Sequence, residues 1–331
     1  MSCKVETSPG RAGRTQAAGQ SPGPAPLAFV VCPSYHGATL LALLLNNHPM
    51  ITALGDTNPT REFDQTCACG RQVSQCPFWE AVRQGVGTGR FDHLHNLLPI
   101  LPAPLENRPL NGGSVTVSRN APLNRLAGRA AAVMADTVLP VAWRLRHKPV
   151  EDYIETWHNF YGLIRELHGT SMVVDGSKSS RKVSVMADAW AGQADLRVIH
   201  LVRDPRGFVA SARRVDPGAE PRALAWLWSD QNRQIEKLSL SVPYLRVRYE
   251  DLAQDPEEQI GPIFDFLALP REPVVCAPRF PEKHHLMGNA MMFKFTGEVR
   301  LDERWRKELT AAAQRQVVRH ATQSMARYGY R

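Results

Sequence analysis

Five short apolar runs, each followed by a loop and a helix-like pattern, restrict the fold of this chain more than any other feature. The runs occupy residues 27–32, 50–54, 171–174, 196–202 and 244–249. Apolar segments of this length that are rich in strand formers are typical of buried strands. Strands that alternate with helices predict an α/β fold in which helices cover both faces of a mostly parallel sheet.

Length and composition limit the domain organisation. Residues 1–26 are rich in Gly, Pro, Ser, Ala and Gln and have no apolar run, so they are predicted to be a disordered leader rather than a secretory signal. Residues 27–331 are predicted to form one domain, with a loop and helical insertion over residues 85–168 on the acceptor side. Within it, residues 123–147 and 151–168 are expected to be helices, and the aromatic residues of the second are expected to be core.

The charge balance suits an anionic ligand. The 331-residue chain has 40 Lys and Arg against 32 Asp and Glu, a net charge of +8. No basic run stands out beyond the leader, which disfavours a nucleic-acid surface. The most apolar later stretch, residues 130–143, is too short for a bilayer span of about 20 residues. A soluble, cytoplasmic protein without a transmembrane segment is expected, and six cysteines in so long a chain do not indicate a disulfide framework.

The loop after the first predicted strand has the position of a phosphate site. It follows a strand and opens a helix, where backbone N–H groups and the helix dipole stabilise an anion. It lacks the Gly-Lys-Ser/Thr ending of a Walker A loop. A purely structural strand-to-helix turn is the alternative. The residues expected to contact a nucleotide here are Ser34, Tyr35, His36, Gly37, Ala38, Thr39 and Leu40.

A second segment, residues 197–211, offers a matching pair of phosphate donors. Arg203 stands at a predicted strand end, where its guanidinium presents a bidentate fork, and Ser211 follows on the first helical turns. In the alternative interpretation Arg203 pairs with a local carboxylate such as Asp204.

Together the two segments resemble the sulfotransferase family. In that family a loop of the type Pro-Arg-Ser-Gly-Thr-Thr-Leu-Leu holds the 5′-phosphosulfate of 3′-phosphoadenosine 5′-phosphosulfate (PAPS). A later strand ending in Val-Arg-Asp-Pro-Arg, with a serine eight residues after its first arginine, holds the 3′-phosphate. Arg203 and Ser211 match those two positions. Segments at 47–49, 69–79, 174–178, 248–252 and 288–289 are also similar to family members, chiefly bacterial ones.

The resemblance covers residues 27–331 and implies a P-loop-like three-layer fold, PAPS as the sulfuryl donor, and no required metal. It also implies that Gly288, Asn289 and Lys294 close over the nucleotide. The chain departs from the family pattern in the first loop, where Tyr35 replaces a Lys or Arg and His36 replaces a Ser.

The charge missing from this loop is expected to come from His36, Lys178 or Arg181. Lys178 matches a lysine of an Asp-Ser-Ser-Lys stretch in such proteins, and an exposed lysine on a solvated loop is the alternative. Asp56 lies where relatives often carry a glutamate that in some members is the catalytic base. We therefore expect Asp56 to be the base, with His36 as a second base candidate or a phosphate donor; a turn residue is the alternative for Asp56.

The function indicated is transfer of a sulfuryl group from PAPS to a hydroxyl or amine of a small-molecule, glycan or lipid-like acceptor. A P-loop phosphotransferase is disfavoured by the missing Walker lysine. A non-catalytic protein that binds PAPS or its 3′,5′-bisphosphate product remains an alternative because of Tyr35 and His36. The sequence indicates neither the acceptor nor the oligomeric state.

Three cysteines raise the question of a zinc site. Cys67, Cys69 and Cys76 could bind a metal with His93 or His95 as a fourth ligand. The spacing lacks the paired C-x-x-C elements of most zinc sites, so a structural loop without metal is predicted.

Overall fold

The structure is a computed structural model that describes residues 26–57, 66–86, 148–191, 195–273, 281–286 and 291–331. The predicted leader and the predicted helix at 123–147 lie outside these residues. All five predicted strands and the helix predicted at 151–168 lie within them, and each is confirmed to within a few residues at its ends.

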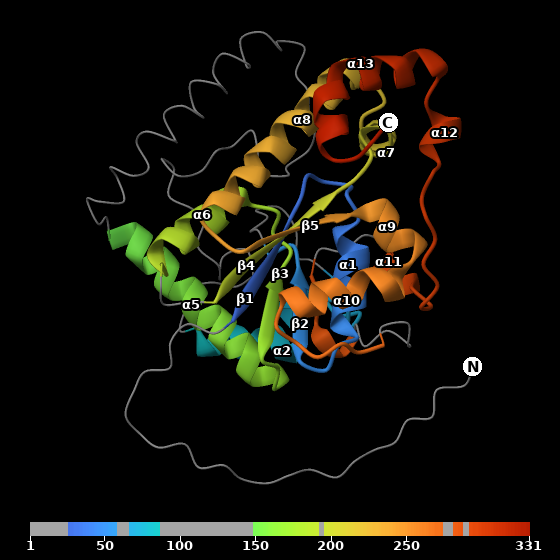
Figure 1. Cartoon of the computed structure of the whole chain (residues 1–331). Coiled ribbons are helices and arrows are strands. Elements are labelled where there is room, and N and C mark those ends of the chain that lie inside the picture. Colours follow the sequence, from blue (N-terminus) through green and yellow to red (C-terminus); the bar gives the residue numbers. More distant parts are fainter. Residues whose placement is uncertain (1–25, 58–65, 87–147, 192–194, 274–280, 287–290) are drawn as a thin grey trace.

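A single five-stranded sheet forms the centre of the molecule (Figure 1). Its strands are β1 (Leu27–Val31), β2 (Ile51–Gly55), β3 (Met172–Asp175), β4 (Leu196–Val202) and β5 (Tyr244–Arg248). Their order is β2-β3-β1-β4-β5, and all four pairings are parallel. The α/β class and the parallel sheet are therefore confirmed.

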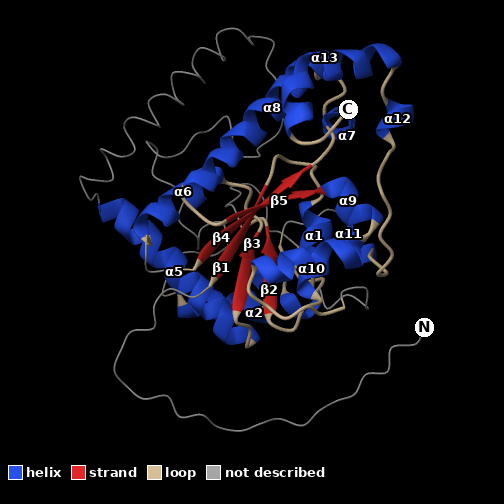
Figure 2. Ribbon diagram, in the orientation of Figure 1, coloured by secondary structure: helices blue, strands red, loops and turns tan. Residues whose placement is uncertain are grey.

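Helices surround this sheet on both faces, as Figure 2 shows. The α-helices are α1 (Ala38–Asn46), α2 (Pro77–Gly85), α5 (Lys148–His168), α6 (Ser180–Ala189), α7 (Pro205–Val215), α8 (Pro221–Glu236), α9 (Tyr249–Gln254), α10 (Pro256–Phe266), α11 (Met291–Lys294), α12 (Trp305–Glu308) and α13 (Ala311–Arg327). Short 3-10 helices are η1 (Val73–Gln75), η2 (Lys237–Leu240) and η3 (Pro281–Lys283). None of the described helices is both long and apolar enough to cross a membrane.

The alternation of side chains along β1 divides the core into two layers. Leu27, Phe29 and Val31 pack into the cluster formed with α2, α5 and α6, whereas Ala28 and Val30 pack with α1 and α10. This is the two-residue period of a strand that is covered on both faces. A third cluster joins α7, α8, α12 and α13 beside the end of β4.

Helix α5 supplies most of the aromatic core on one face. Tyr153, Trp157, Phe160, Tyr161 and Ile164 are buried, so the prediction that these residues are core is confirmed for them. Leu167, near the end of the helix, is 43% exposed and does not share this role.

The parallel arrangement brings the ends of the strands to one edge of the sheet. The loops after β1, β2, β3 and β4 begin at Cys32, Asp56, Gly176 and Arg203 respectively. Ligands of open α/β sheets bind at this carboxyl edge. The candidate residues of the sequence are therefore collected in one region by the topology.

A buried ion pair stabilises this edge. Lys182 Nζ lies 2.8 Å from Asp175 Oδ2 and 2.9 Å from the centroid of the Trp157 ring. Thr57 and Tyr161 donate hydrogen bonds to the same carboxylate oxygen. Burial alone would raise the pKa of Asp175, but Lys182 and the two hydroxyl donors outweigh it and hold the pKa below its usual range. Because the folded-state pKa is depressed, the stability that this carboxylate contributes is present at neutral pH and is lost as the pH falls.

Removal of the carboxylate should destabilise the fold strongly. Asp175→Ala leaves the Lys182 ammonium buried without its partner, so we expect the free energy of unfolding, measured in urea, to fall by about 3–5 kcal/mol. The matched control is Asp195→Ala, which breaks the exposed Arg197 to Asp195 pair and should cost at most about 1 kcal/mol. Equal losses in the two variants would contradict the role given to the buried pair.

Candidate functional site

The backbone of the loop after β1 is left-handed at two positions, a conformation that most residues adopt only at a cost. Tyr35 and Gly37 both have positive φ angles, 65° and 91°. Gly37 is the N-cap of α1, and a Cβ atom at this position would lie 2.4 Å from the Tyr249 ring. Glycine is therefore required by conformation and by space. The left-handed backbone of Tyr35 is of the kind that concentrates at functional sites and costs about 1–3 kcal/mol.

Arg203 contacts this loop directly. Its side chain is nearly buried at 6% exposure, and Nη1 donates a hydrogen bond of 2.8 Å to the carbonyl of Tyr35. Nη2 lies 3.1 Å from Asp302 Oδ2, and the guanidinium stacks 4.5 Å from the Tyr249 ring centroid. Arg203 therefore has a carboxylate partner, but this partner is Asp302 from a distant segment. Asp204 pairs with Arg206 instead, at 2.6 Å.

Ser211 lies in α7, the helix that follows Arg203, but its hydrogen bond goes to a residue of α7 rather than to the loop after β1. Its Oγ accepts a hydrogen bond of 2.7 Å from Arg214 Nη2, and Arg214 in turn pairs with Glu308 at 2.6 Å. Within the described part of the chain, no hydrogen bond joins Ser211 to Arg203. The structure therefore brings Arg203 to the loop and keeps Ser211 in a separate polar network.

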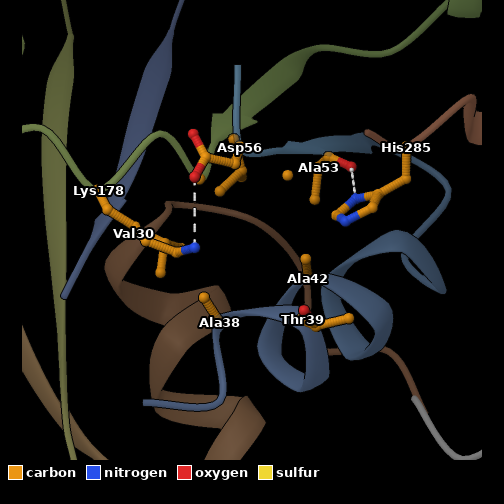
Figure 3. A pocket seen from close by; sticks show the side chains of 11 residues that line it. Val30, Ala38, Thr39, Ala42, Ala53, Asp56, Lys178 and His285 are labelled. Carbon is orange, nitrogen blue, oxygen red and sulfur yellow. Dashed lines mark hydrogen bonds and ion pairs between the residues drawn. The ribbon is translucent and has the colours of Figure 1, made fainter. Parts of the chain in front are cut away.

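A pocket between α1 and the ends of β2 and β3 is lined by two further candidates, Asp56 and Lys178 (Figure 3). Lys178 Nζ lies 3.3 Å from Asp56 Oδ2 across this pocket. His285 closes another side, where its Nδ1 donates to the Ala53 carbonyl at 3.0 Å. The remaining lining residues come from the strands and from α1: Val30, Ala38, Thr39, Ala42, Gly55, Val174 and Gly176.

Lys178 is the cation of this pocket. It lies in the loop after β3, where its backbone is left-handed with φ 61°, and its side chain lines the pocket. Burial alone would lower the pKa of the ammonium, but the Asp56 carboxylate outweighs it and raises the pKa above its usual range. Lys178 is consequently protonated throughout the physiological range.

His36 cannot supply the same charge. The ring is 1% exposed, and burial lowers its pKa to about 3. Nδ1 lies 2.9 Å from the Ser34 carbonyl, so Nδ1 carries the proton and Nε2 has none to donate. The neutral ring packs against Phe208, with 5.5 Å between centroids. This tautomer is unsuited to donate to a phosphate through Nε2. Arg181, the third candidate for the missing charge, lies in the first turn of α6.

The C-terminal candidates are only partly placed. Gly288 and Asn289 lie outside the described residues. Lys294 ends the short helix α11, which contacts α1, but its side chain is not among those described. Leu40 lies in the first turn of α1, and its side chain is buried.

Two features of the site were missed by sequence reasoning. His285 gives no local signal, because its approach to β2 depends on the pairing of Leu286 with Gly55. Lys182 stands four residues beyond the Lys178 motif, and a lysine on an amphipathic helix is ordinarily solvated. Its ammonium lies against the aromatic rings of Trp157 and Tyr161 in α5 and Phe29 in β1, contacts that no local sequence pattern shows.

The sheet order and the phosphate-type loop after β1 define a P-loop-like α/β protein. Residues 193–273 match a family model described as the sulfotransferase family. The sulfotransferase domain of an olefin synthase from Synechococcus PCC 7002 is similar in fold, with a TM-score of 0.50 and 20% identity over 94% of this chain and 98% of that chain. The sulfotransferase STF9 from Mycobacterium avium gives a TM-score of 0.44 and 13% identity over 94% and 78% of the two chains. No curated protein matches the chain in sequence.

The matched segment contains β4, Arg203 and Ser211. This segment carries the similarity to the sulfotransferase family, and the chain as a whole shares its fold with a solved sulfotransferase domain.

Substitution by alanine should have opposite effects on stability at Gly37 in the loop and at Gly162 in helix α5. Gly37→Ala imposes a left-handed Ala, which costs about 1–2 kcal/mol, and also forces the Tyr249 ring to move. Gly162→Ala in α5 places a methyl group in open space and should stabilise the helix by about 0.5–1 kcal/mol. Denaturant unfolding measures both changes. A Gly37→Ala variant as stable as the wild type would show that the loop is not constrained as described.

Proposed function

We propose that this protein transfers a sulfuryl group from PAPS to a hydroxyl or amine of a small-molecule, glycan or lipid-like acceptor. The observation that supports it most is the convergence of two cations on the loop after β1: the buried Arg203 at the Tyr35 carbonyl and the partly exposed Lys178 in the adjoining pocket. The cytoplasmic location expected from the sequence is part of the same proposal.

The donor would bind along the carboxyl edge of the sheet. Backbone amides from Ser34 to Leu40, at the N-terminus of α1, would hold the 5′-phosphosulfate. Arg203, with Ser211 nearby on α7, would hold the 3′-phosphate. In the described structure Arg203 Nη2 already binds the Asp302 carboxylate. A phosphate oxygen would take the place of this carboxylate, since both are anionic acceptors for the same donor.

The reaction would take place between Asp56 and Lys178. Asp56 would accept the proton of the acceptor hydroxyl as its oxygen forms a bond to sulfur. The bond between sulfur and the bridging phosphate oxygen would break, and adenosine 3′,5′-bisphosphate would leave with the electron pair. Lys178 would stabilise the negative charge that grows on the leaving oxygen, and so supply the cation missing at position 35.

A non-catalytic binding protein is the second candidate. The side chain of Tyr35 replaces the usual cation, and the buried His36 is neutral. If Lys178 remains bound to Asp56 when the nucleotide is present, neither group is available for transfer. Binding of PAPS without transfer to any acceptor would then be the activity of the chain.

Nucleotide binding should depend on Arg203. Arg203→Met removes a charge-assisted contact worth about 1.5–3 kcal/mol, so we expect the dissociation constant for adenosine 3′,5′-bisphosphate, measured by calorimetry, to rise at least about tenfold. Arg197→Met is the matched control, since Arg197 is the second residue of the same strand, at the opposite edge of the sheet, and pairs with Asp195. Unchanged affinity in Arg203→Met would exclude the assignment. Tight binding of magnesium ATP instead would favour a phosphotransferase.

Turnover should depend on Asp56 without a matching effect on nucleotide affinity. With labelled PAPS and a panel of acceptors, Asp56→Asn should slow sulfuryl transfer by about 10²–10⁴-fold, as expected for loss of a general base. Asp195→Asn, an exposed strand-edge change, should transfer at the wild-type rate. A near wild-type rate in Asp56→Asn excludes this residue as the base. No transfer by the wild type to any acceptor, with bisphosphate binding intact, would identify the non-catalytic binding protein.

A further inference from the structure

Three cysteines and one histidine, none of which lines the pocket, form a compact cluster. The ligand atoms of Cys67, Cys69, Cys76 and His284 all lie within 4.8 Å of one another. Cys69 and Cys76 sulfurs are 3.7 Å apart, and His284 Nδ1 lies 3.5 Å from the Cys67 sulfur and 3.3 Å from the Cys76 sulfur. The cluster therefore brings together side chains that are up to 217 residues apart in the sequence.

These separations are those of ligands around one tetrahedral ion. With zinc–sulfur bonds of about 2.3 Å and zinc–nitrogen bonds of about 2.0–2.1 Å, tetrahedral geometry places two sulfurs ~3.8 Å apart and a sulfur and a nitrogen ~3.6 Å apart. A disulfide requires a sulfur–sulfur distance of about 2.05 Å, and the four cysteines within the described ranges are free. From the geometry we infer that Cys67, Cys69, Cys76 and His284 bind a structural Zn²⁺ ion.

The local backbone presents the ligands to one point. Cys67 and Cys69 flank a tight turn in which the Gly70 amide bonds the Cys67 carbonyl at 2.8 Å, and Gly70 has φ 86°. Cys76 stands directly before α2. His284 has a left-handed backbone, φ 48°, and its ring stacks on Phe78 with 4.4 Å between centroids and 1° between planes. A non-glycine residue in this conformation must be held by its surroundings, and a metal bond would hold it.

The sequence argument against zinc considered only nearby histidines as the fourth ligand. His93 and His95, the local candidates, lie outside the described residues. The histidine that completes the set follows Cys76 by 208 residues. Cys₃His is a common set for structural zinc, and four protein ligands leave no open position for substrate. The site is thus structural, and the inference does not depend on the proposed transfer reaction.

The ion would fix one wall of the pocket. The Ala68 amide donates to the His285 carbonyl at 3.0 Å, and the Leu286 amide donates to Leu54 of β2 at 2.7 Å. His285, next to the ligand His284, lines the pocket opposite Lys178. Zinc would therefore join the cysteine loop to the segment that forms this wall.

Metal analysis of the untagged full chain, purified under reducing conditions, tests the inference. We expect one zinc ion per chain. Removal of zinc and reloading with Co²⁺ should give the thiolate charge-transfer band and the intense visible bands of a tetrahedral cobalt site, a readout that needs no substitution. Cys76→Ser and His284→Ala should each lower zinc affinity, measured by competition with a chelator, at least about tenfold, the least expected even for an outer-shell partner.

Cys32→Ala is the matched control, because Cys32 is also buried and free but belongs to the loop after β1. It should retain the full zinc content. The inference is overturned if the wild type binds neither zinc nor cobalt in stoichiometric amount. It is also overturned if Cys69 and Cys76 form a disulfide under reducing conditions, or if Cys32→Ala loses zinc as readily as Cys76→Ser.

Discussion

The parallel pairing of β1 with β3 and β4 is the constraint on which the candidate site depends. Phe29 is in register with Asp175, and Val31 is in register with His200. Continued past the strand ends, this register brings Lys178 level with Cys32 and Arg203 level with the loop that follows. Burial raises the pKa of the Cys32 thiol, and the nearby positive charge of Lys178 acts in the opposite direction. Arg203 indeed bonds the Tyr35 carbonyl. Two cations from strands on either side of β1 therefore meet one loop.

Three cations of the described residues at this edge have carboxylate partners. Lys182 pairs with Asp175, Lys178 with Asp56, and Arg203 with Asp302. The net charge of +8 thus says little about the site, where local charges are balanced. The three pairs differ in exposure: the first is fully buried and structural, whereas Lys178 and Asp302 retain partial access to solvent. Only the latter two pairs are placed where an anionic ligand could exchange with a carboxylate.

The strands and the positions of Arg203 and Asp56 could be predicted because they depend on local information. Residues 196–202 form a mostly apolar run, interrupted by Arg197 and His200, that ends at a charged loop, and such a run indicates a buried parallel strand. The partners of these residues could not be predicted. Asp302 lies 99 residues beyond Arg203, and His284 lies 208 residues beyond Cys76. Contacts over such distances in the sequence leave no local pattern from which they could be predicted. Ser211 occupies the predicted position, yet its contact with Arg214 depends on side-chain directions within a helix, which motif spacing does not specify.

The ring of Tyr249 touches the two halves of the candidate site at once. It fills the space that a side chain at Gly37 would need, it stacks on Arg203, and its hydroxyl accepts a hydrogen bond from the Asp302 amide at 3.2 Å. The Tyr249 ring thus lies between Gly37 and the Arg203 guanidinium and contacts both. Both neighbours contact the same ring, so a change in the position of either would act on this ring first. If a nucleotide binds as proposed, with one end at the Gly37 turn and the other at Arg203, both ends would border this one side chain.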